Sequence, residues 1–221
     1  MNVSDAVARR ISVRAFKPDP VPLAVLQEIL TAAQRAPSGG NLQPWKVYVL
    51  TGEPLAALSQ TAVATALART EQAEYDIYPK DLWAPLKTRR FECGEDMYAR
   101  LGISREDKAK RLEWFGRNLQ FFGAPVGLFF TVDRRCGPPQ WSDVGMFMQT
   151  LMLLAVERGL DTCAQEFWAT LPKTVQAATG HPDEEMLFSG MSLGYRDDTA
   201  PVNELRTRRE ALDEVAQFIG F

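Results

Sequence analysis

Apolar side chains recur at helical spacing in three long stretches of the chain, and these stretches predict its main helices. The first runs from Pro22 to about Arg35 and is apolar over most of its circumference, so we expect it to be buried. The second, at 53–67, has one face rich in alanine and another rich in leucine. The third is capped by Ser142 and runs to about Arg158 with apolar residues on nearly every face, which is typical of a core spine or a subunit interface.

Short runs rich in β-branched and aromatic residues predict strands between these helices. They occupy residues 46–51, 126–132, 160–164 and 186–193, with a break in the last run at Gly190. The alternating segment 11–16 is also expected to be extended, and shorter helices are expected at 4–10 and from Pro172. A terminal helix is expected where apolar residues repeat at 212–221. Several connections lack a βαβ rhythm, so we expect an α+β fold, a layered mixed sheet flanked by helices.

Charged residues become dense between 69 and 117, with aromatic side chains scattered among them. Two or three amphipathic helices are expected in this helical excursion, one of them from Ser104, where Ser-x-x-Asp resembles a capping box. The excursion is either a solvated surface element or a lid whose aromatic residues cover a pocket. Residues 1–221 are expected to form a single domain that includes it.

Composition and charge narrow the classes of function. The net charge of −3 gives no reason to expect a nucleic-acid partner, and no apolar stretch approaches the ~20 residues that span a bilayer. Three widely separated cysteines favour neither a disulfide framework nor a zinc site, and with no signal peptide in evidence they fit a reducing cytoplasm. The single histidine, His181, lies in Gly-His-Pro-Asp and is expected in a loop or at the surface. Catalytic chemistry is therefore expected from an organic cofactor and not from a metal.

The loop at 36–45, Ala-Pro-Ser-Gly-Gly-Asn-Leu-Gln-Pro-Trp, is a candidate binding segment. Its adjacent glycines permit unusual backbone conformations and close approach of N–H groups to a ligand. Ser38, Asn41 and Gln43 add short polar side chains, and the flanking prolines restrict the loop. These features are typical of a rigid cradle for a flat or anionic ligand, but a helix end followed by a turn has the same composition.

Two groups of arginines lie at opposite ends of the chain. The first surrounds Ser12 and the second surrounds Thr207, and their members are Arg10, Arg14, Arg206, Arg208 and Arg209. The planar guanidinium group matches phosphate oxygens, so each group is either a phosphate site or a set of solvated charges. Alternation along 10–14 would put the first group on one face of an extended segment.

The segment 161–167 reads as a strand end that opens into a loop, where backbone N–H groups could face the edge of a ligand. Cys163 within it is expected to be a small buried apolar residue, because no histidine or basic residue adjoins it. No strand–GxGxxG–helix unit is present, so a Rossmann dinucleotide site has no support.

Three segments together resemble the nitroreductase family of FMN-dependent oxidoreductases. They are Arg9–Phe16, Ala36–Trp45 and Gly190–Tyr195. The Pro-Ser-x-x-Asn-x-Gln-Pro-Trp pattern is specific to the family, and the order and spacing match along almost the whole chain. Residues 92–98 look closer to the branch that includes nitrobenzoate and dinitroaniline reductases.

The resemblance implies an intertwined homodimer with two FMN sites in the subunit interface. The cofactor-binding residues that it implies are Arg10, Ile11, Ser12 and Arg14 at the ribityl phosphate and flavin edge, Arg206 and Arg209 at the phosphate, Pro37, Ser38, Gly39 and Asn41 from the other subunit, Asn118 or Gln120 at the pyrimidine end, and Gln165, Glu166 and Phe167 at flavin N5 and O4. Ile11, Thr207 and Phe167 depart from the commonest family pattern, which leaves backbone roles there. No side chain is expected to be catalytic, because the chemistry occurs at the flavin.

The function that the resemblance implies is a cytoplasmic ping-pong oxidoreductase. NADPH or NADH passes a hydride to flavin N5, and an electron-poor aromatic acceptor, a nitroaromatic or quinone-like compound, then takes its place. Alternatives on the same fold are a flavin or enone reductase, a reductive dehalogenase and a flavin-cleaving enzyme, and a flavin-binding protein without turnover is a further one. The sequence does not choose between the two nicotinamides.

Overall fold

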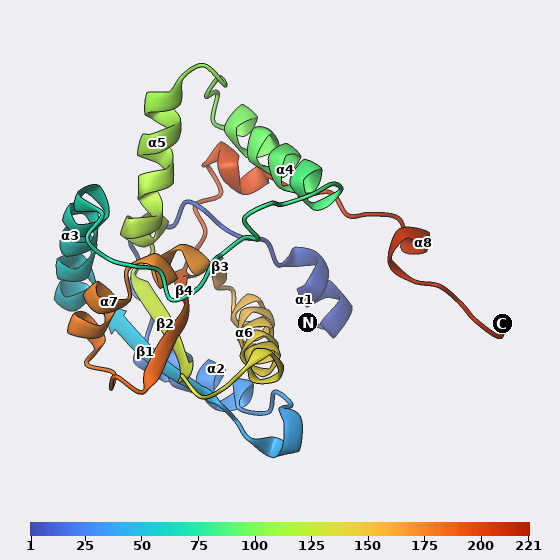
Figure 1. The fold of residues 1–221 in the computed structure, drawn as a ribbon, viewed down its shortest axis with the longest axis horizontal. Helices are drawn as coiled ribbons and strands as arrows, with labels where there is room; N and C mark the ends of the chain where they lie inside the picture. The colour runs from blue at the N-terminus through green and yellow to red at the C-terminus, as the bar shows by residue number, and fades with distance from the viewer.

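A four-stranded antiparallel sheet forms the centre of the molecule in the computed structural model, which describes residues 1–221 (Figure 1). The strands are β1 (Trp45–Thr51), β2 (Val126–Asp133), β3 (Asp161–Gln165) and β4 (Glu185–Gly194), in the order β1-β2-β4-β3. These strands are confirmed to within one residue at each end. The layered α+β architecture is also confirmed, with parallel pairing limited to one bridge between Ser12 and Thr162.

Helices cover both faces of the sheet, because its central strands are apolar on both sides. Alternate residues of β2 point to opposite faces: Val126, Leu128 and Phe130 pack into one core cluster and Phe129 into the other. The first cluster includes residues of α2 (Leu23–Ala33) and α6 (Pro138–Glu157), and the second includes residues of α3 (Gly52–Ala68), α7 (Pro172–Thr179) and the 3-10 segment η2 (Arg117–Gly123). Helices α2 and α6 thus pack in the same cluster. The expected burial of α2 is confirmed for one face only, because Leu26, Ile29 and Ala33 are buried whereas Leu23 is 68% exposed.

The remaining short elements lie at the edges of this body. They are α1 (Val3–Arg9), η1 (Gly39–Asn41), η3 (Glu166–Thr170), η4 (Pro201–Glu204) and α8 (Leu212–Val215). The expected terminal helix is wrong beyond this single turn of α8, because its apolar residues meet no other element of the chain and the tail extends away from the body (Figure 1). No helix combines the length and apolar character needed to cross a membrane.

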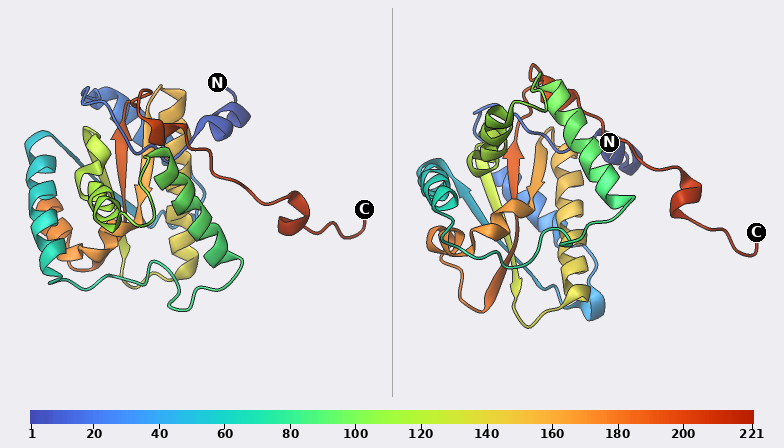
Figure 2. Two further views of the ribbon diagram at one scale, coloured as in Figure 1. Left: turned by 90° about the horizontal axis from the view of Figure 1, so that it is seen from above. Right: turned by 45° about the horizontal axis from the view of Figure 1, so that its top comes forward.

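The dense charges of the excursion form two helices, α4 (Leu86–Arg100) and α5 (Lys108–Gly116), that stand away from the sheet (Figure 2). Neither helix contains a buried residue. The expected start of α5 at Ser104 is wrong. The cap is Asp107, whose Oδ1 accepts a hydrogen bond from the Lys110 N–H at 3.1 Å.

Two further expectations are wrong, namely the start of α6 and the break in β4, and two others are made more specific by the packing. Helix α6 begins at Pro138 and not at Ser142, because the proline conformation suits the first helical turn. Strand β4 continues through Gly190, and its irregularity falls opposite the step from Phe130 to Thr131. The segment 11–16 makes only isolated bridges to the sheet. His181 does lie in a loop, but it is buried there against Tyr48, with ring centroids 5.7 Å apart.

Candidate active site

A cavity of about 640 Å³ lies between the sheet and the two outer helices. We call its lower wall, Ala164–Phe167 at the end of β3, the floor, and its upper wall, α4 with α5, the roof. Seven aromatic side chains line it: Tyr78, Phe91, Tyr98, Trp114, Phe115, Phe122 and Phe167. The volume lies within the range of about 300–1,000 Å³ that is usual for ligand and cofactor sites.

Gln165 fixes the floor through its side chain. Its Nε2 donates to the backbone oxygen of Asn118 at 2.9 Å and to Oδ1 of Asn118 at 3.2 Å, and its Oε1 accepts from the Ser192 hydroxyl at 2.7 Å. Asn118 in turn donates from Nδ2 to the Phe115 oxygen at 2.9 Å. Gln165 is buried and fully committed to the protein, so any contact that it makes with a ligand comes from its backbone.

Glu166 and Phe167 begin η3 where the floor faces the cavity. The first N–H groups of a helix have no partner within it, so their donors are available at this point. The Glu166 carboxyl is exposed to the cavity but has no ion-pair partner, and burial in the concave wall raises its pKa. Phe167 meets the roof, its ring 5.0 Å from that of Phe115 in an edge-to-face arrangement.

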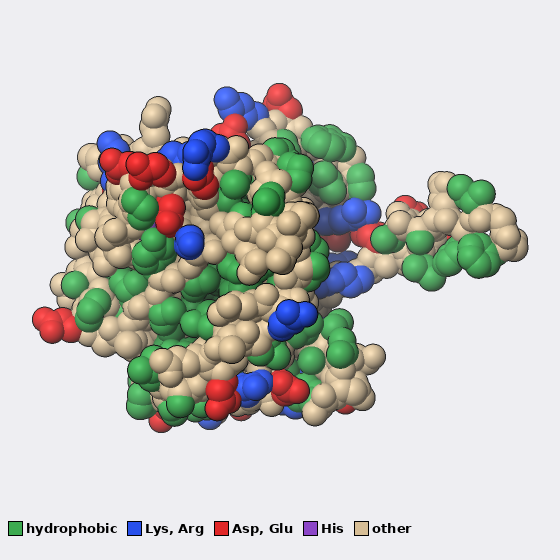
Figure 3. Space-filling view, turned by 90° about the horizontal axis from the view of Figure 1, so that it is seen from below, with side chains coloured by type: hydrophobic (Ala, Val, Ile, Leu, Met, Phe, Trp, Pro, Cys, Tyr) green, Lys and Arg blue, Asp and Glu red, His purple; other side chains and the backbone are tan.

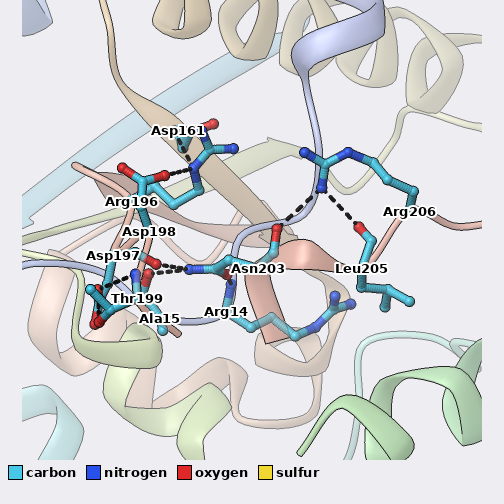
Figure 4. A network of polar contacts seen from close by, with 10 residues as sticks. All are labelled: Arg14, Ala15, Asp161, Arg196, Asp197, Asp198, Thr199, Asn203, Leu205 and Arg206. Atoms are coloured by element: carbon cyan, nitrogen blue, oxygen red, sulfur yellow. Dashed lines mark hydrogen bonds and ion pairs between the residues drawn. The ribbon is translucent and has the colours of Figure 1, made fainter. Parts of the chain in front are cut away.

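Arg14 reaches the same cavity from the N-terminal segment (Figure 4). Its only side-chain hydrogen bond runs from Nη1 to the Ser12 oxygen at 3.2 Å, which leaves most of the guanidinium donors free. Asn203 anchors the backbone of this segment. Its Oδ1 accepts from the Arg14 N–H at 2.9 Å, and its Nδ2 donates to the oxygens of Ala15 and Asp197, both at 2.8 Å.

Asn203 is a site residue that the sequence analysis missed. It is buried in η4, 189 residues from Arg14, and completes the hydrogen bonds of two segments that are distant in the chain. No local pattern around Asn203 signals this role, because its partners are backbone groups that only the fold brings together.

A smaller cavity of about 280 Å³ lies near the other end of β3. Arg206 lines it together with Arg9, Arg196 and Asp161. Burial raises the pKa of Asp161, and the nearby Arg196 opposes that shift. Arg206 donates from Nη1 to the Asn203 oxygen at 3.1 Å, so the same asparagine residue connects the two arginine groups (Figure 4).

The structure brings some of the sequence-predicted residues together and leaves others apart. Five of them line the main cavity, namely Arg14, Asn118, Gln165, Glu166 and Phe167. Arg10, Ile11 and Ser12 precede Arg14 on the segment beside β3 and line neither cavity. Gln120, the alternative to Asn118, lines a separate groove beside Thr51.

The arginines near the C-terminus also separate. Arg208 forms an ion pair with Asp96 of α4 at 3.1 Å. Arg209 lines neither cavity and donates to Thr207 and to the Arg208 oxygen within the tail. Only Arg206 lines a cavity.

The glycine-rich loop lies at the opposite end of the molecule from the roof (Figure 1). The Gly39 N–H donates to both carboxylate oxygens of Asp143 at 3.3 Å, which docks the loop on α6. Asn41 and Gln43 adopt positive φ angles of 58° and 48°, a strained conformation that often occurs at functional sites. The main cavity of the same chain is lined by none of the predicted loop residues, which are Pro37, Ser38, Gly39 and Asn41.

Comparison with known proteins identifies the family. The family described as "Nitroreductase family" matches residues 7–195. The 4-nitrobenzoate reductase of Pseudomonas putida is 41% identical over 97% of this chain and 94% of its own length. The nitrobenzene nitroreductase of Ectopseudomonas oleovorans is 37% identical over 98% of this chain and 96% of its own length.

A solved structure agrees with these sequence relatives. The FMN and NADPH-dependent nitroreductase NfnB from Sphigopyxis sp. strain HMH superposes with a TM-score of 0.96 and is 50% identical, with all of both chains covered. The segments that carry the sequence resemblance thus occur in a chain whose whole fold agrees with a solved relative. The chain belongs to the nitroreductase family.

Proposed function

We propose that this chain is an FMN-dependent oxidoreductase that uses NADPH or NADH to reduce nitroaromatic or quinone-like compounds. The observation that carries the proposal is the main cavity, where an arginine with free donors, the open start of η3 and aromatic walls come together. The names of the relatives support it, because two denote reductases of nitroaromatic compounds and the solved structure is of an FMN and NADPH-dependent enzyme.

The residues of the main cavity fit a planar, anionic cofactor. The free donors of Arg14 match a phosphate, and the rings of Trp114 and Phe115 offer flat apolar surface. When bound, FMN supplies hydride transfer at N5. The protein then has to bind, orient and shield it.

Each side of the cavity has a separate task in this proposal. In this proposal Arg14 would hold the phosphate or the flavin edge from inside the main cavity. Arg206 would approach the phosphate from the smaller cavity. Arg10, Ser12 and Arg209 line neither cavity and would contribute from the N- and C-terminal segments. Backbone N–H groups of the floor would face flavin N5 and O4, where a fixed donor would stabilise developing charge. The hydrogen bonds between Gln165 and Asn118 keep the floor in place while ligands exchange.

We also propose that the working unit is an intertwined homodimer, in which Pro37, Ser38, Gly39 and Asn41 complete the partner's site. Apolar surface without cover supports this. Figure 3 shows the C-terminal tail standing clear of the body with apolar side chains along it. Phe218 is 66% exposed, Ile219 86% and Val7 of α1 53%. Side chains of this size are usually covered, so a second copy of the chain is the expected cover.

The lid that we propose comprises α4 and α5, which is less than the whole excursion. The preceding coil is attached to the body of the molecule, because Glu74 forms an ion pair with Arg134, just after β2, at 2.7 Å, and Glu71 accepts from the N–H of Lys173 in α7 at 2.7 Å. Helix α4 of the roof is joined to the C-terminal segment by exposed ion pairs, such as Arg100 with Glu204 at 2.9 Å. Motion that admits a ligand is therefore expected in α4 and α5.

We place the enzyme in the cytoplasm. Its three cysteines are unpaired, which fits a reducing compartment. Nicotinamide donors are available there, and assays with NADPH and NADH in parallel identify the donor used.

Purified protein tests the function directly. We expect a yellow protein that oxidises NADPH or NADH only when a nitroaromatic or quinone acceptor is present. Arg14→Ala is expected to raise the Kd for FMN about tenfold, because a charge-assisted hydrogen bond is lost. Substitution of the exposed Arg105 by alanine is expected to leave this Kd unchanged. Colourless protein that FMN cannot reconstitute would contradict the proposal.

Light scattering during size-exclusion chromatography tests the dimer. Full-length protein is expected to elute with twice the mass of one chain. A chain ending at Glu210 is expected to dissociate at higher concentration than the full chain does, because it lacks the apolar tail. A full-length monomer that retains FMN at full occupancy would refute the shared site.

A further inference from the structure

Two arginines line the main cavity, and they differ in what surrounds them. Arg14 lies on the floor side and belongs to the proposed cofactor site. Arg90 lies on α4 in the roof, where the cavity-facing residues Arg90, Gly94 and Met97 follow helical spacing. The proposed cofactor site leaves Arg90 without an assigned role.

The guanidinium group of Arg90 is oriented by a ring and has no acidic partner. Its Cζ lies 4.2 Å from the centre of the Tyr78 ring. No ion pair or side-chain hydrogen bond involves Arg90, whereas other arginines of the roof are paired. Arg89 lies 2.8 Å from Glu210, and Arg111 lies 2.6 Å from Glu95. The donors of Arg90 are therefore free at the cavity wall.

The carboxylates of the cavity do not neutralise this charge. The Glu95 carboxylate already accepts two hydrogen bonds from Arg111, one from Nη1 at 2.6 Å and one from Nη2 at 3.1 Å. Glu166 lies on the floor and forms no ion pair with Arg90 within 4.0 Å. A ligand held between the floor and the roof thus meets an uncompensated positive group at the roof.

We propose that Arg90 is a specificity-determining residue that selects aromatic acceptors carrying a carboxylate. The inference rests on the proposed function. An aromatic acid that lies flat over the floor presents its carboxylate at its rim, where the planar guanidinium can form two parallel hydrogen bonds. Tyr78 keeps the guanidinium oriented, so less side-chain freedom is lost on binding.

The test compares a matched pair of acceptors in the FMN-loaded enzyme, 4-nitrobenzoate and its neutral methyl ester. Arg90→Ala is expected to lower kcat/KM for the acid about tenfold, equivalent to about 1.4 kcal/mol, mainly through KM. The kcat/KM for the ester is expected to change less than twofold. The kcat/KM of Arg90→Lys for the acid is expected to lie between those of wild type and Arg90→Ala, because lysine keeps the positive charge but lacks the planar guanidinium group.

Arg105→Ala is the matched control. Arg105 also stacks on an aromatic ring, with its Cζ 5.2 Å from the centre of the Phe91 ring, and has no ion pair, but it does not line the cavity. It is expected to leave the ratio of acid to ester unchanged. A titration with benzoate, followed by flavin absorbance, gives a readout without turnover, and Arg90→Ala is expected to weaken benzoate binding about tenfold.

Four outcomes overturn the inference, and they are distinguishable. Equal loss for acid and ester, or no loss for either, shows that Arg90 does not recognise the carboxylate. A rise in KM for NADPH without a rise for NADH assigns the arginine to the phosphate of the donor. Wild-type enzyme that reduces neither of these two compounds, nor any other nitroaromatic or quinone acceptor, refutes the proposed function itself; wild-type enzyme that reduces other acceptors but not 4-nitrobenzoate refutes the inference alone.

Discussion

The floor and the roof of the cavity face each other but are held by different forces. Behind the floor, Trp168 is fully buried, stacks on Phe121 with ring centres 4.7 Å apart and meets Phe129 edge-to-face at 5.3 Å. The roof has no buried residue, and the ion pairs that join α4 to the C-terminal segment are exposed and contribute little to stability. A further attachment is the edge-to-face contact of Phe115 in α5 with Phe167. The floor is thus a rigid part of the core, and the roof can change position or sequence at small energetic cost.

This difference suggests a division of labour. Cofactor geometry depends on fixed donors, which belong on rigid elements, and the floor supplies them. Acceptor choice depends on the wall that closes over the ligand, and the roof supplies residues such as Arg90. Substitutions in the floor are therefore expected to act on stability and cofactor retention, and those in the roof on acceptor preference.

The largest expected effect concerns Gly190, directly behind the floor. A Cβ at this position would lie 2.3 Å from Cδ1 of Trp168, so the core must shift to accept it. Gly190→Ala is expected to lower the free energy of unfolding by about 3 kcal/mol, measured by urea denaturation. Gly116→Ala at the end of α5 is the control, because nothing lies within 4 Å of its Cβ. Equal effects of the two substitutions would refute the rigid floor.

Asn203→Ala is expected to have the next largest effect. The substitution removes an acceptor and a donor from three buried or half-buried hydrogen bonds, so a loss of about 2 kcal/mol is expected in the same measurement. FMN retention after dialysis is expected to fall as well, because Arg14 loses its backbone anchor. Full retention in the destabilised protein would limit Asn203 to a role in folding.

Gly94→Ala in the roof is expected to change the free energy of unfolding in the opposite direction, by raising it. Gly94 lies inside α4, lines the cavity and has nothing within 4 Å of its Cβ position. Alanine is expected to raise the free energy of unfolding by about 0.5–1 kcal/mol, because glycine is a poor helix former. The added methyl group narrows the cavity, so kcat/KM is expected to fall for bulky acceptors more than for nitrobenzene. Lower stability, or equal loss for both acceptors, would contradict this role.

The smallest expected effect depends on pH. Burial raises the pKa of Glu166, so the folded protein keeps a proton that the unfolded chain releases above the ordinary value of 4.5. Stability conferred by wild-type Glu166 therefore falls as pH rises from that value to the raised pKa. Glu166→Gln is expected to be more stable than wild type at pH 7 and equal to it below about pH 4, by urea midpoints. An equal difference in urea midpoint between Glu166→Gln and wild type at pH 7 and below about pH 4 would show that the carboxyl is not desolvated.

Local patterns were sufficient for much of the fold. The four strands and the helices at 23–33 and 52–68 depend on residues close in sequence, and their periodicity was readable directly. The segments around Arg14 and Asn41 were also recognisable, because their residue types are unusual at that spacing. Expectations failed at element ends such as Ser104, where a cap nearby in sequence, Asp107, served instead.

Only the tertiary structure decided which of these segments meet. The sheet order, the place of Asn203 between two distant segments and the unpaired state of Arg90 all arise from contacts across the fold. The tail was predicted to be helical from its apolar spacing, but such a stripe needs a surface to pack against, and its own chain offers none. Sequence by itself therefore determined the elements and the candidate chemistry. Packing between distant residues decided the cavity, its rigid floor and its adaptable roof.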